Sequence, residues 1–469
     1  MSEVTVAPPQ YRRFSSVRLG QAPTTMTTQA SPADLPPYSR RRRDTVSQMP
    51  RREPVAHTYQ LVSGSKAWAV WKVVSSAKSS KSLPTFYEKE TITGTLSLDV
   101  DRFESIQAIY VTVSTNTSDA DEQAITGIDF QVTGRIITGA GSSDSYTFLN
   151  TSVPIWSKVA AGAKLQGSST WPFSVPLPKT VSIPTSSGGS KLCPLPETFM
   201  ERGMMASIQY DLTLRIARGK LRADSTLTTP FGYVPSSKPE SPSMLRQLAY
   251  EEGCPTIPGP DVDPEGWRIL PTVPVAGTLF NSRQLEARCN IAIAKPLCYT
   301  RGSVIPCTLT MDSLDVQALD LLATSKAIVV NLRRTVRYYN SPSPLNKSDV
   351  LWRELSEDVG RAVWWPSVRG RGDDYIRYLE GEIQLAKDLK PSASIAHFSV
   401  SYSVVICPFD SPGFISSTTE PLHSEPVEIA TMYARGPKPR SYAPPSYSRS
   451  TPRNEEFYAT MYGFPATLQ

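Results

Sequence analysis

Large apolar residues alternate with polar ones along most of the chain between Tyr59 and Met432. The clearest stretch runs from Ile208 to Ile216, where every second residue is apolar and the residues between are Gln, Asp, Thr and Arg. A period of two places the two sets on opposite faces of a strand. One apolar and one polar face is typical of antiparallel sheets with one solvated side. Turn clusters separate further segments with this alternation: 92–100, 128–132, 285–293, 328–338 and 398–406.

The stretch Tyr299–Met311 combines a bend with such a strand. Arg301-Gly302 supplies the bend, because glycine tolerates positive φ. Pro306 has no backbone N–H, so it is expected near a strand start or at a sheet edge. We expect this strand to open a second β-sandwich. Its apolar face consists of Ile305, Cys307, Leu309 and Met311.

Residues 223–263 interrupt the alternation. Ser236–Pro242 is rich in proline and serine, and Ser243–Glu252 predicts a short helix. We interpret this stretch as the connection between two domains. A shorter helical turn is expected within Asp312–Thr324, and Val427–Met432 is expected to close the second sheet.

Many short strands separated by turns favour sandwich architectures. The sequence therefore predicts an all-β protein with two tandem antiparallel β-sandwiches of the immunoglobulin-like type. The terminal segments have few large apolar residues and cannot offset the entropy of ordering, so they are expected to be disordered. The predicted parts are an N-terminal tail (1–57), a first sandwich (58–235), a linker or insertion (236–263), a second sandwich (264–434) and a C-terminal tail (435–469).

Composition adds charge and proline to this picture. The chain has 42 prolines in 469 residues, nearly twice the usual share of about 5%. The formal net charge is +6, and the segment Ser39–Arg52 alone contributes +5 of it. The remainder is close to neutral, which argues against a nucleic-acid-binding body.

The basic segment contains four consecutive arginines, Arg40, Arg41, Arg42 and Arg43. One interpretation is attraction to an anionic membrane, worth about 1 kcal/mol per residue near a charged bilayer. Others are basophilic kinase recognition at Thr45 and Ser47, a nuclear-import signal, or a tail that only aids solubility.

Enzymatic and metal-dependent functions find little support. The chain has three histidines and six widely spaced cysteines, without a C-x-x-C, G-x-S-x-G, H-E-x-x-H or phosphate-loop motif. We expect no catalytic residues, no metal and no cofactor. The N-terminus lacks the apolar segment of a secretory signal, and no apolar run approaches the length of a membrane span. A cytoplasmic protein with free thiols is expected.

Three proline–tyrosine motifs lie in the predicted tails. Proline pre-sets a polyproline II backbone that docks between aromatic rings, and the tyrosine fills an adjacent pocket, as in recognition by WW domains. Chance matches arise in any proline-rich tail, but three, none of them in a strand, favour function. The predicted WW-binding residues are Pro8, Pro9 and Tyr11; Leu35, Pro36 and Tyr38; and Pro444, Pro445 and Tyr447.

The predicted strand 328–338 also contains three arginines. Arg334 falls in register with apolar residues, so it is either buried with a carboxylate or carbonyl partner or turned outward by a bulge; we favour the bulge. Arg333 and Arg337 would face solvent. They are candidates for contact with phosphorylated cargo, although we favour an ordinary solvated face.

Several segments in order resemble the arrestin family. The segment L-P-E-T-F at 195–199, with the strand after it, is similar to the end of an arrestin N-terminal domain. Tyr299–Met311 resembles the start of the C-terminal domain, which reads Y-x-R-G-x-x-I-P. Leu332–Val336 and Tyr87–Leu98 resemble strands of the second and first domain. The segment L-P-E-T-F at 195–199 departs from the family pattern at Glu197 and Thr198.

This resemblance, together with the proline–tyrosine motifs, implies a fungal-type arrestin-related trafficking adaptor. Such adaptors bring a WW-domain HECT ubiquitin ligase to membrane transporters or receptors, whose cytoplasmic tails are the expected cargo. The place of action would be the cytoplasm, peripherally at the plasma membrane or endosomes. The alternative is an arrestin-like sorting or signalling scaffold that acts without a ubiquitin ligase.

Overall fold

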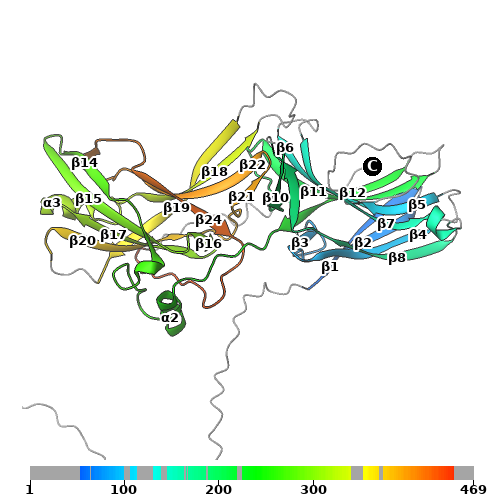
Figure 1. Ribbon diagram of the computed structural model, residues 1–469, viewed down its shortest axis with the longest axis horizontal. Coiled ribbons are helices and arrows are strands. Elements are labelled where there is room, and N and C mark those ends of the chain that lie inside the picture. Colours follow the sequence, from blue (N-terminus) through cyan, green and yellow to red (C-terminus); the bar gives the residue numbers. More distant parts are fainter. Residues whose placement is uncertain are drawn as a thin grey trace, which may run out of the picture. The chain divides into compact units, whose positions relative to one another are not determined.

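The computed structural model describes residues 53–447, except for residues 64, 100–105, 113–129, 139–144, 163–164, 166, 186–187, 219–223, 340–351 and 369–372. The described part of the chain is built almost entirely from strands (Figure 1). They form two β-sandwiches that follow one another along the chain. The predicted all-β class with tandem sandwiches is confirmed. The exact boundaries proposed for the five parts of the chain stay predictions.

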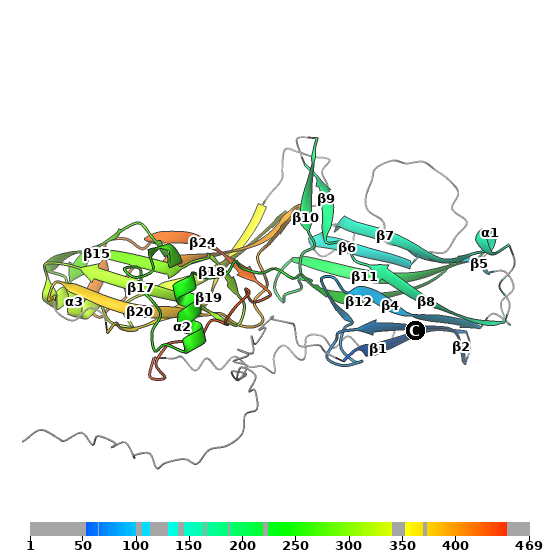
Figure 2. The ribbon, with the colours of Figure 1, turned by 60° about the horizontal axis from the view of Figure 1, so that its bottom comes forward.

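In its described residues, the first sandwich pairs a four-stranded sheet with a six-stranded one. Adjacent strands are antiparallel, apart from the parallel pair β3–β12. The four-stranded sheet has the order β1 (Val55–Ser63), β2 (Lys66–Ser75), β4 (Thr91–Asp99) and β8 (Ser168–Pro176). The six-stranded sheet has the order β3 (Thr85–Tyr87), β12 (Ser225–Val234), β11 (Ala206–Arg218), β5 (Ile106–Thr112), β7 (Ser145–Ser157) and β6 (Phe130–Thr138). Figure 2 shows the hairpin of β9 (Thr180–Pro184) and β10 (Ser190–Pro194) projecting from these sheets.

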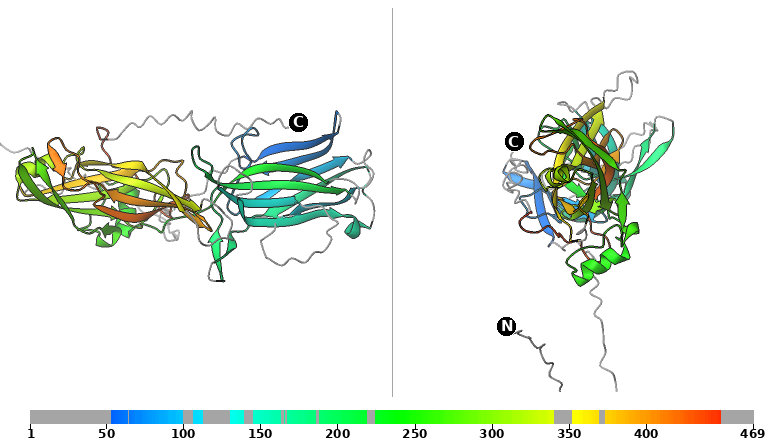
Figure 3. Two further views of the ribbon diagram at one scale, coloured as in Figure 1. Left: turned by 90° about the horizontal axis from the view of Figure 1, so that it is seen from above. Right: turned by 90° about the vertical axis from the view of Figure 1, so that its left-hand side faces the viewer.

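The strands of this sandwich form two layers (Figure 3). Aromatic side chains fill the space between the layers. The Trp71 ring, from β2, is fully buried, and its centroid lies 4.7 Å from that of Phe130 on β6. Phe173 on β8 lies 4.9 Å from Phe130. A Cβ at Gly94 would fall 2.5 Å from the tip of the Phe173 ring, so glycine at this position lets the ring approach β4 closely. Such rings bury about 150–250 Å² each and dominate the core.

The second sandwich is one continuous sheet of twelve strands, counted over the described residues, that turns back on itself. The turn occurs in β19: Trp352–Arg361 pairs with β18, whereas Ala362–Pro366 pairs with β20. Its main path is β16 (Cys298–Thr300), β24 (His423–Ala430), β22 (Phe398–Ile406), β18 (Val330–Tyr339), β19 (Trp352–Pro366), β20 (Ile376–Gln384), β17 (Val304–Asp312), β15 (Arg283–Ala294), β14 (Val273–Leu279) and β23 (Phe414–Ser416), with β13 (Trp267–Ile269) on β15 and β21 (Ala393–Ile395) on β22.

Strand β17 confirms the apolar face predicted for Tyr299–Met311. Ile305, Cys307, Leu309 and Met311 are all buried. Pro306 lies near the strand start, just before the pairing with β15 begins at Cys307. The expectation that this strand opens the second sandwich is wrong, because β13–β15 precede it in the same sheet. A single apolar face cannot tell an opening strand from one that, like β17, is paired on both sides.

Short helices occupy the connections. Helix α2 (Met244–Glu252) begins after its N-cap Ser243 and ends at Gly253, whose φ of 69° suits glycine. It confirms the helix expected at Ser243–Glu252. Helix α3 (Val316–Leu322) lies within Asp312–Thr324, and α1 (Lys158–Ala161) and the 3₁₀ turn η1 (Pro264–Gly266) are shorter. In the described residues, every helix is too short to cross a bilayer.

Candidate functional site

The C-terminal proline–tyrosine motif, Pro444–Tyr447, lies at the end of the described chain. Pro444 is half-buried, whereas Pro445, Ser446 and Tyr447 are exposed. The motif forms a turn in which the Tyr447 N–H donates to the Pro444 carbonyl at 2.8 Å. Disorder was expected from residue 435 onward. In residues 435–447 the structure differs, because these residues make hydrogen bonds with the second sandwich and the α2 connection.

The other two proline–tyrosine motifs, Pro8–Tyr11 and Leu35–Tyr38, lie outside the described residues. The arginine run Arg40–Arg43 lies outside them too. Their proposed roles in WW-domain docking, membrane attraction and kinase recognition therefore stay predictions from sequence.

Arg333 and Arg337, the candidates for phosphate contact, each face an acidic neighbour on β19. Arg333 binds Asp358 through two nitrogens, at 2.8 and 3.3 Å, and its hydrogen bond holds the pKa of that carboxyl below its usual value. Arg337 pairs with Glu354 at 3.1 Å and lies 5.0 Å from the centroid of the Trp352 ring. A phosphorylated ligand would have to displace these acids, so contact with cargo at either arginine stays a prediction.

Arg334 is buried, contrary to the favoured expectation of an outward bulge. Two of its nitrogens bind Glu201, at 2.7 and 2.6 Å, and Glu357 lies 2.5 Å away. A bulge does occur, between Leu332 and Arg333 in the pairing with β19, but burial continues to alternate along β18. Burial lowers the pKa of the Arg334 guanidinium, yet the hydrogen bonds and charges of its acidic partners outweigh this and raise that pKa. Glu201 precedes β11, so the pair joins segments of both sandwiches.

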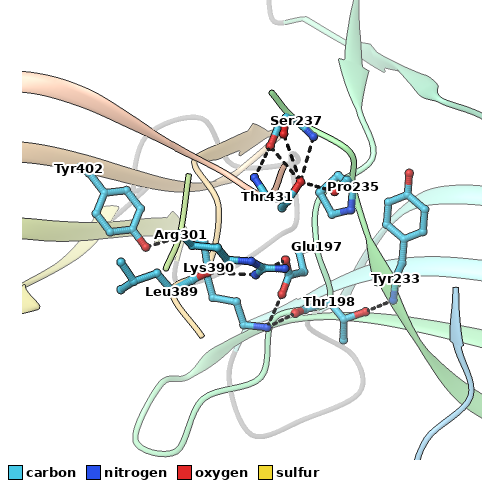
Figure 4. Close-up of polar contacts among 10 residues, drawn as sticks. All are labelled: Glu197, Thr198, Tyr233, Pro235, Ser237, Arg301, Leu389, Lys390, Tyr402 and Thr431. Carbon is cyan, nitrogen blue, oxygen red and sulfur yellow. Dashed lines mark hydrogen bonds and ion pairs between the residues drawn. The ribbon is translucent and has the colours of Figure 1, made fainter. Parts of the chain in front are cut away.

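A second polar cluster forms around Glu197, as Figure 4 shows. Its carboxylate accepts from Arg301 at 2.9 Å and from Lys390 at 3.0 Å. Lys390 also donates to the Thr198 carbonyl at 2.8 Å, and the Thr198 hydroxyl accepts from the Tyr233 N–H at 2.8 Å. The two residues that depart from the family pattern are therefore the ones that make these contacts. The sequence pattern does not predict this role, because it identifies Arg301 only as part of a bend.

Two histidines and the cysteines of the described residues have structural surroundings. His57 is buried and hydrogen-bonds the Ser75 hydroxyl at 2.8 Å, and burial lowers its pKa. The His397 ring stacks on Tyr339. All six cysteines lie in the described residues as free thiols, and burial raises the pKa of Cys289 to about 12. Such a thiol is almost entirely protonated at neutral pH, so it is a weak nucleophile.

Comparison with known proteins identifies the first sandwich. Residues 76–232 match the family described as arrestin (or S-antigen), N-terminal domain. No curated protein matches the chain. A solved structure named pT26-6p matches at 8% identity over 82% of this chain and 67% of its own, with a TM-score of 0.18. A putative membrane anchored protein from Corynebacterium diphtheriae matches at 9% identity over 83% of this chain and 97% of its own, with a TM-score of 0.09. At such TM-scores neither structure informs the fold.

The architecture and the match together define the class. The chain has two consecutive β-sandwiches, and the first carries an arrestin N-terminal domain. It is therefore an arrestin-like protein, of the kind that serves as an adaptor in trafficking or signalling. Arrestins act by binding and carry no enzymatic activity of their own.

Proposed function

We propose that this protein is an arrestin-related adaptor that recruits a WW-domain HECT ubiquitin ligase to plasma-membrane transporters or receptors. The ligase carries out the ubiquitination that leads to endocytosis, and the adaptor brings the ligase close to a cargo lysine. The observation that carries the proposal is the set of three proline–tyrosine motifs in the sequence of a chain with an arrestin-like body. The exposure of Pro445 and Tyr447 at the end of the described chain supports it.

Three motifs act together more strongly than one. A single proline–tyrosine motif buries little surface, so each docking is weak. Two or more motifs on one chain raise the overall affinity by about 10²–10⁴ when the ligase has several WW domains. The placement of motifs before and after the sandwiches leaves both sandwiches available for cargo.

The test removes the tyrosine of each motif. In the full-length triple variant Tyr11→Ala, Tyr38→Ala, Tyr447→Ala, binding to a ligase fragment with several WW domains should fall by about 10²-fold or more, because the pocket-filling ring and the avidity are both lost. Isothermal titration calorimetry measures the affinity. The matched control is Gln10→Ala with Ser446→Ala, which changes only the variable position of two motifs and should leave binding within about twofold.

The outcome separates the proposal from its alternative. Unchanged ligase binding by the triple variant would contradict the adaptor mechanism. If the variant loses the ligase but still supports cargo sorting in cells, the arrestin-like scaffold without a ligase explains the function better. If both are lost while the control variant keeps both, the adaptor proposal stands.

A further inference from the structure

The last described segment, residues 435–447, lies against helix α2 and strand β20. We call these residues the C-terminal segment. The Ser241 hydroxyl donates to the Arg435 carbonyl at 3.2 Å, and the Tyr442 ring stacks on Tyr250 of α2 with centroids 6.3 Å apart. A Cβ at Gly253, the C-cap of α2, would fall 2.9 Å from a guanidinium nitrogen of Arg440. A cation at this end of a helix is favoured by the helix dipole.

Glu382 on β20 anchors the C-terminal segment. Its carboxylate accepts from the Ser441 hydroxyl and, at 2.9 Å, from the Tyr442 N–H. Within the described chain, these are the hydrogen bonds made by this carboxylate. Leu379, Gly381 and Ile383 face the core, so alternation places Glu382 on the outer face of the sheet, yet it is only 2% exposed. Glu382 is therefore buried because the C-terminal segment covers it, and Tyr442 lines the same small pocket as Glu382.

A covered carboxylate depends on its donors. Burying a charge without hydrogen bonds is costly, so Glu382 is stable under cover only while Ser441 and Tyr442 remain in place. The cover is itself imperfect, since the Tyr442 hydroxyl is buried without a hydrogen-bond partner in the described residues. Segments with few contacts of this kind open locally at low free energy. We call this arrangement, in which the C-terminal segment covers Glu382, the closure. A small change at Glu382 can release it.

The closed form is unsuited to docking by Pro444–Tyr447. WW domains bind an extended polyproline II backbone, which has no internal hydrogen bonds. Here the Tyr447 N–H bonds back to the Pro444 carbonyl, and Pro444 is half-buried. Only Ala443 separates the motif from the Tyr442 anchor. A WW domain therefore competes with the closure.

Ser441 is placed where modification would break the closure. The residue is exposed, and it follows Arg440 directly and Lys438 by three positions, both of them exposed cations suited to a basophilic kinase. A phosphoryl group removes the hydroxyl donor and adds about −1.5 to −2 charges beside the Glu382 carboxylate. Two anions cannot share this covered position.

We propose that Ser441 is a phosphorylation site, and that its modification detaches the C-terminal segment from Glu382 and frees Pro444–Tyr447 for docking. The docking step rests on the function proposed above. In the modification, Ser441 Oγ forms a bond to the γ-phosphorus of a nucleoside triphosphate held by a protein kinase. The bond from that phosphorus to the β–γ bridging oxygen breaks, the nucleoside diphosphate leaves, and the hydroxyl proton passes to a base of the kinase.

The first test measures the closure itself. Full-length protein with phosphoserine incorporated at residue 441 is compared with the unmodified protein by hydrogen exchange. The Tyr442 amide, which donates to Glu382, should exchange about tenfold faster or more in the phosphorylated chain. Glu382→Ala should have the same effect without phosphate, whereas Ser441→Ala, which removes one donor and adds no charge, should have a smaller one. Unchanged exchange in both the phosphorylated chain and Glu382→Ala would overturn the proposal.

The second test measures docking with the motifs at Tyr11 and Tyr38 disabled by alanine. A single WW domain of a HECT ligase should bind the unmodified chain about tenfold more weakly than the phosphorylated chain, as expected when about a tenth of the molecules are open. Synthetic peptides of residues 438–450, with and without phosphate on Ser441, show any direct effect of the phosphate. Equal affinity of both chains, with peptides that bind, would overturn the regulation. Faster exchange with peptides that do not bind would retain the switch and refute the proposed docking function.

Discussion

The Arg334 guanidinium is almost completely buried, whereas its two acidic partners are not. The Arg334 side chain is 9% exposed, against 27% for Glu201 and 50% for Glu357. If the arginine is removed, both acids can be hydrated. If the acids are neutralised, a charged group remains buried without an ionised partner. The Arg334 Nε atom already lacks a hydrogen-bond partner in the described residues. The energetic consequence of a change therefore depends on which partner is changed.

We predict that Glu201→Gln with Glu357→Gln destabilises the protein more than Arg334→Met. The double variant should cost about 3–5 kcal/mol, the range for a buried charge left without its partner. Arg334→Met should cost about 1–2 kcal/mol, because the exposed acids lose only a partly screened interaction. Urea unfolding followed by tryptophan fluorescence gives both free energies. A larger loss for Arg334→Met would contradict this ranking.

At the residue scale, the sequence identifies the core but not the buried charges. Alternation correctly places Ile305, Cys307 and Leu309 inside, because one sheet face decides their burial. Glu382 and Glu197 carry no such signal. Glu382 lies on the outer face of β20, and its cover comes from residues about sixty positions away. Only the fold brings such partners together, so a charge that appears solvated in the sequence can be covered in the structure.

At the scale of elements, Arg246 links helix α2 to the second sandwich. Arg246 is 1% exposed and donates to the Lys295 carbonyl at 2.8 Å and to the Gly266 carbonyl at 2.7 Å. Its guanidinium carbon lies 4.8 Å from the centroid of the Trp267 ring. The sequence predicts α2 from its cap and composition, but not this attachment, because the carbonyl partners belong to turns without a periodic pattern.

We predict that Arg246→Met destabilises the protein by about 2–4 kcal/mol, because two carbonyls lose their donor in a buried setting. The loss should appear in urea unfolding as a lower midpoint. Arg288→Met is the matched control. It removes an arginine paired with Asp312 whose side chain is 74% exposed, and it should change stability by less than about 1 kcal/mol. Similar losses in the two variants would show that Arg246 does not anchor α2.

At the scale of the whole molecule, polar contacts join segments of the two sandwiches. Glu197 accepts from Arg301 and Lys390 of the second sandwich, and all three side chains are at most 18% exposed. Nearby, the Thr431 hydroxyl donates to the Pro235 carbonyl at 2.7 Å (Figure 4). The sequence predicts two sandwiches from alternation, but says nothing about how strongly one depends on the other. These contacts contribute to that dependence together with apolar ones, because the buried apolar side chains of both sandwiches form one continuous cluster.

We predict that Glu197→Ala separates the thermal unfolding of the two sandwiches. The substitution removes the carboxylate through which the first sandwich binds the Arg301 and Lys390 cations of the second, so a contact that favours joint unfolding is lost. Differential scanning calorimetry should show one transition for the unchanged protein, and two transitions or a broadened one for the variant, because two-state behaviour requires the parts to unfold together. Lys390→Met alone leaves the Arg301–Glu197 pair in place and should broaden the transition less. A single, unbroadened transition in Glu197→Ala would show that other contacts couple the sandwiches.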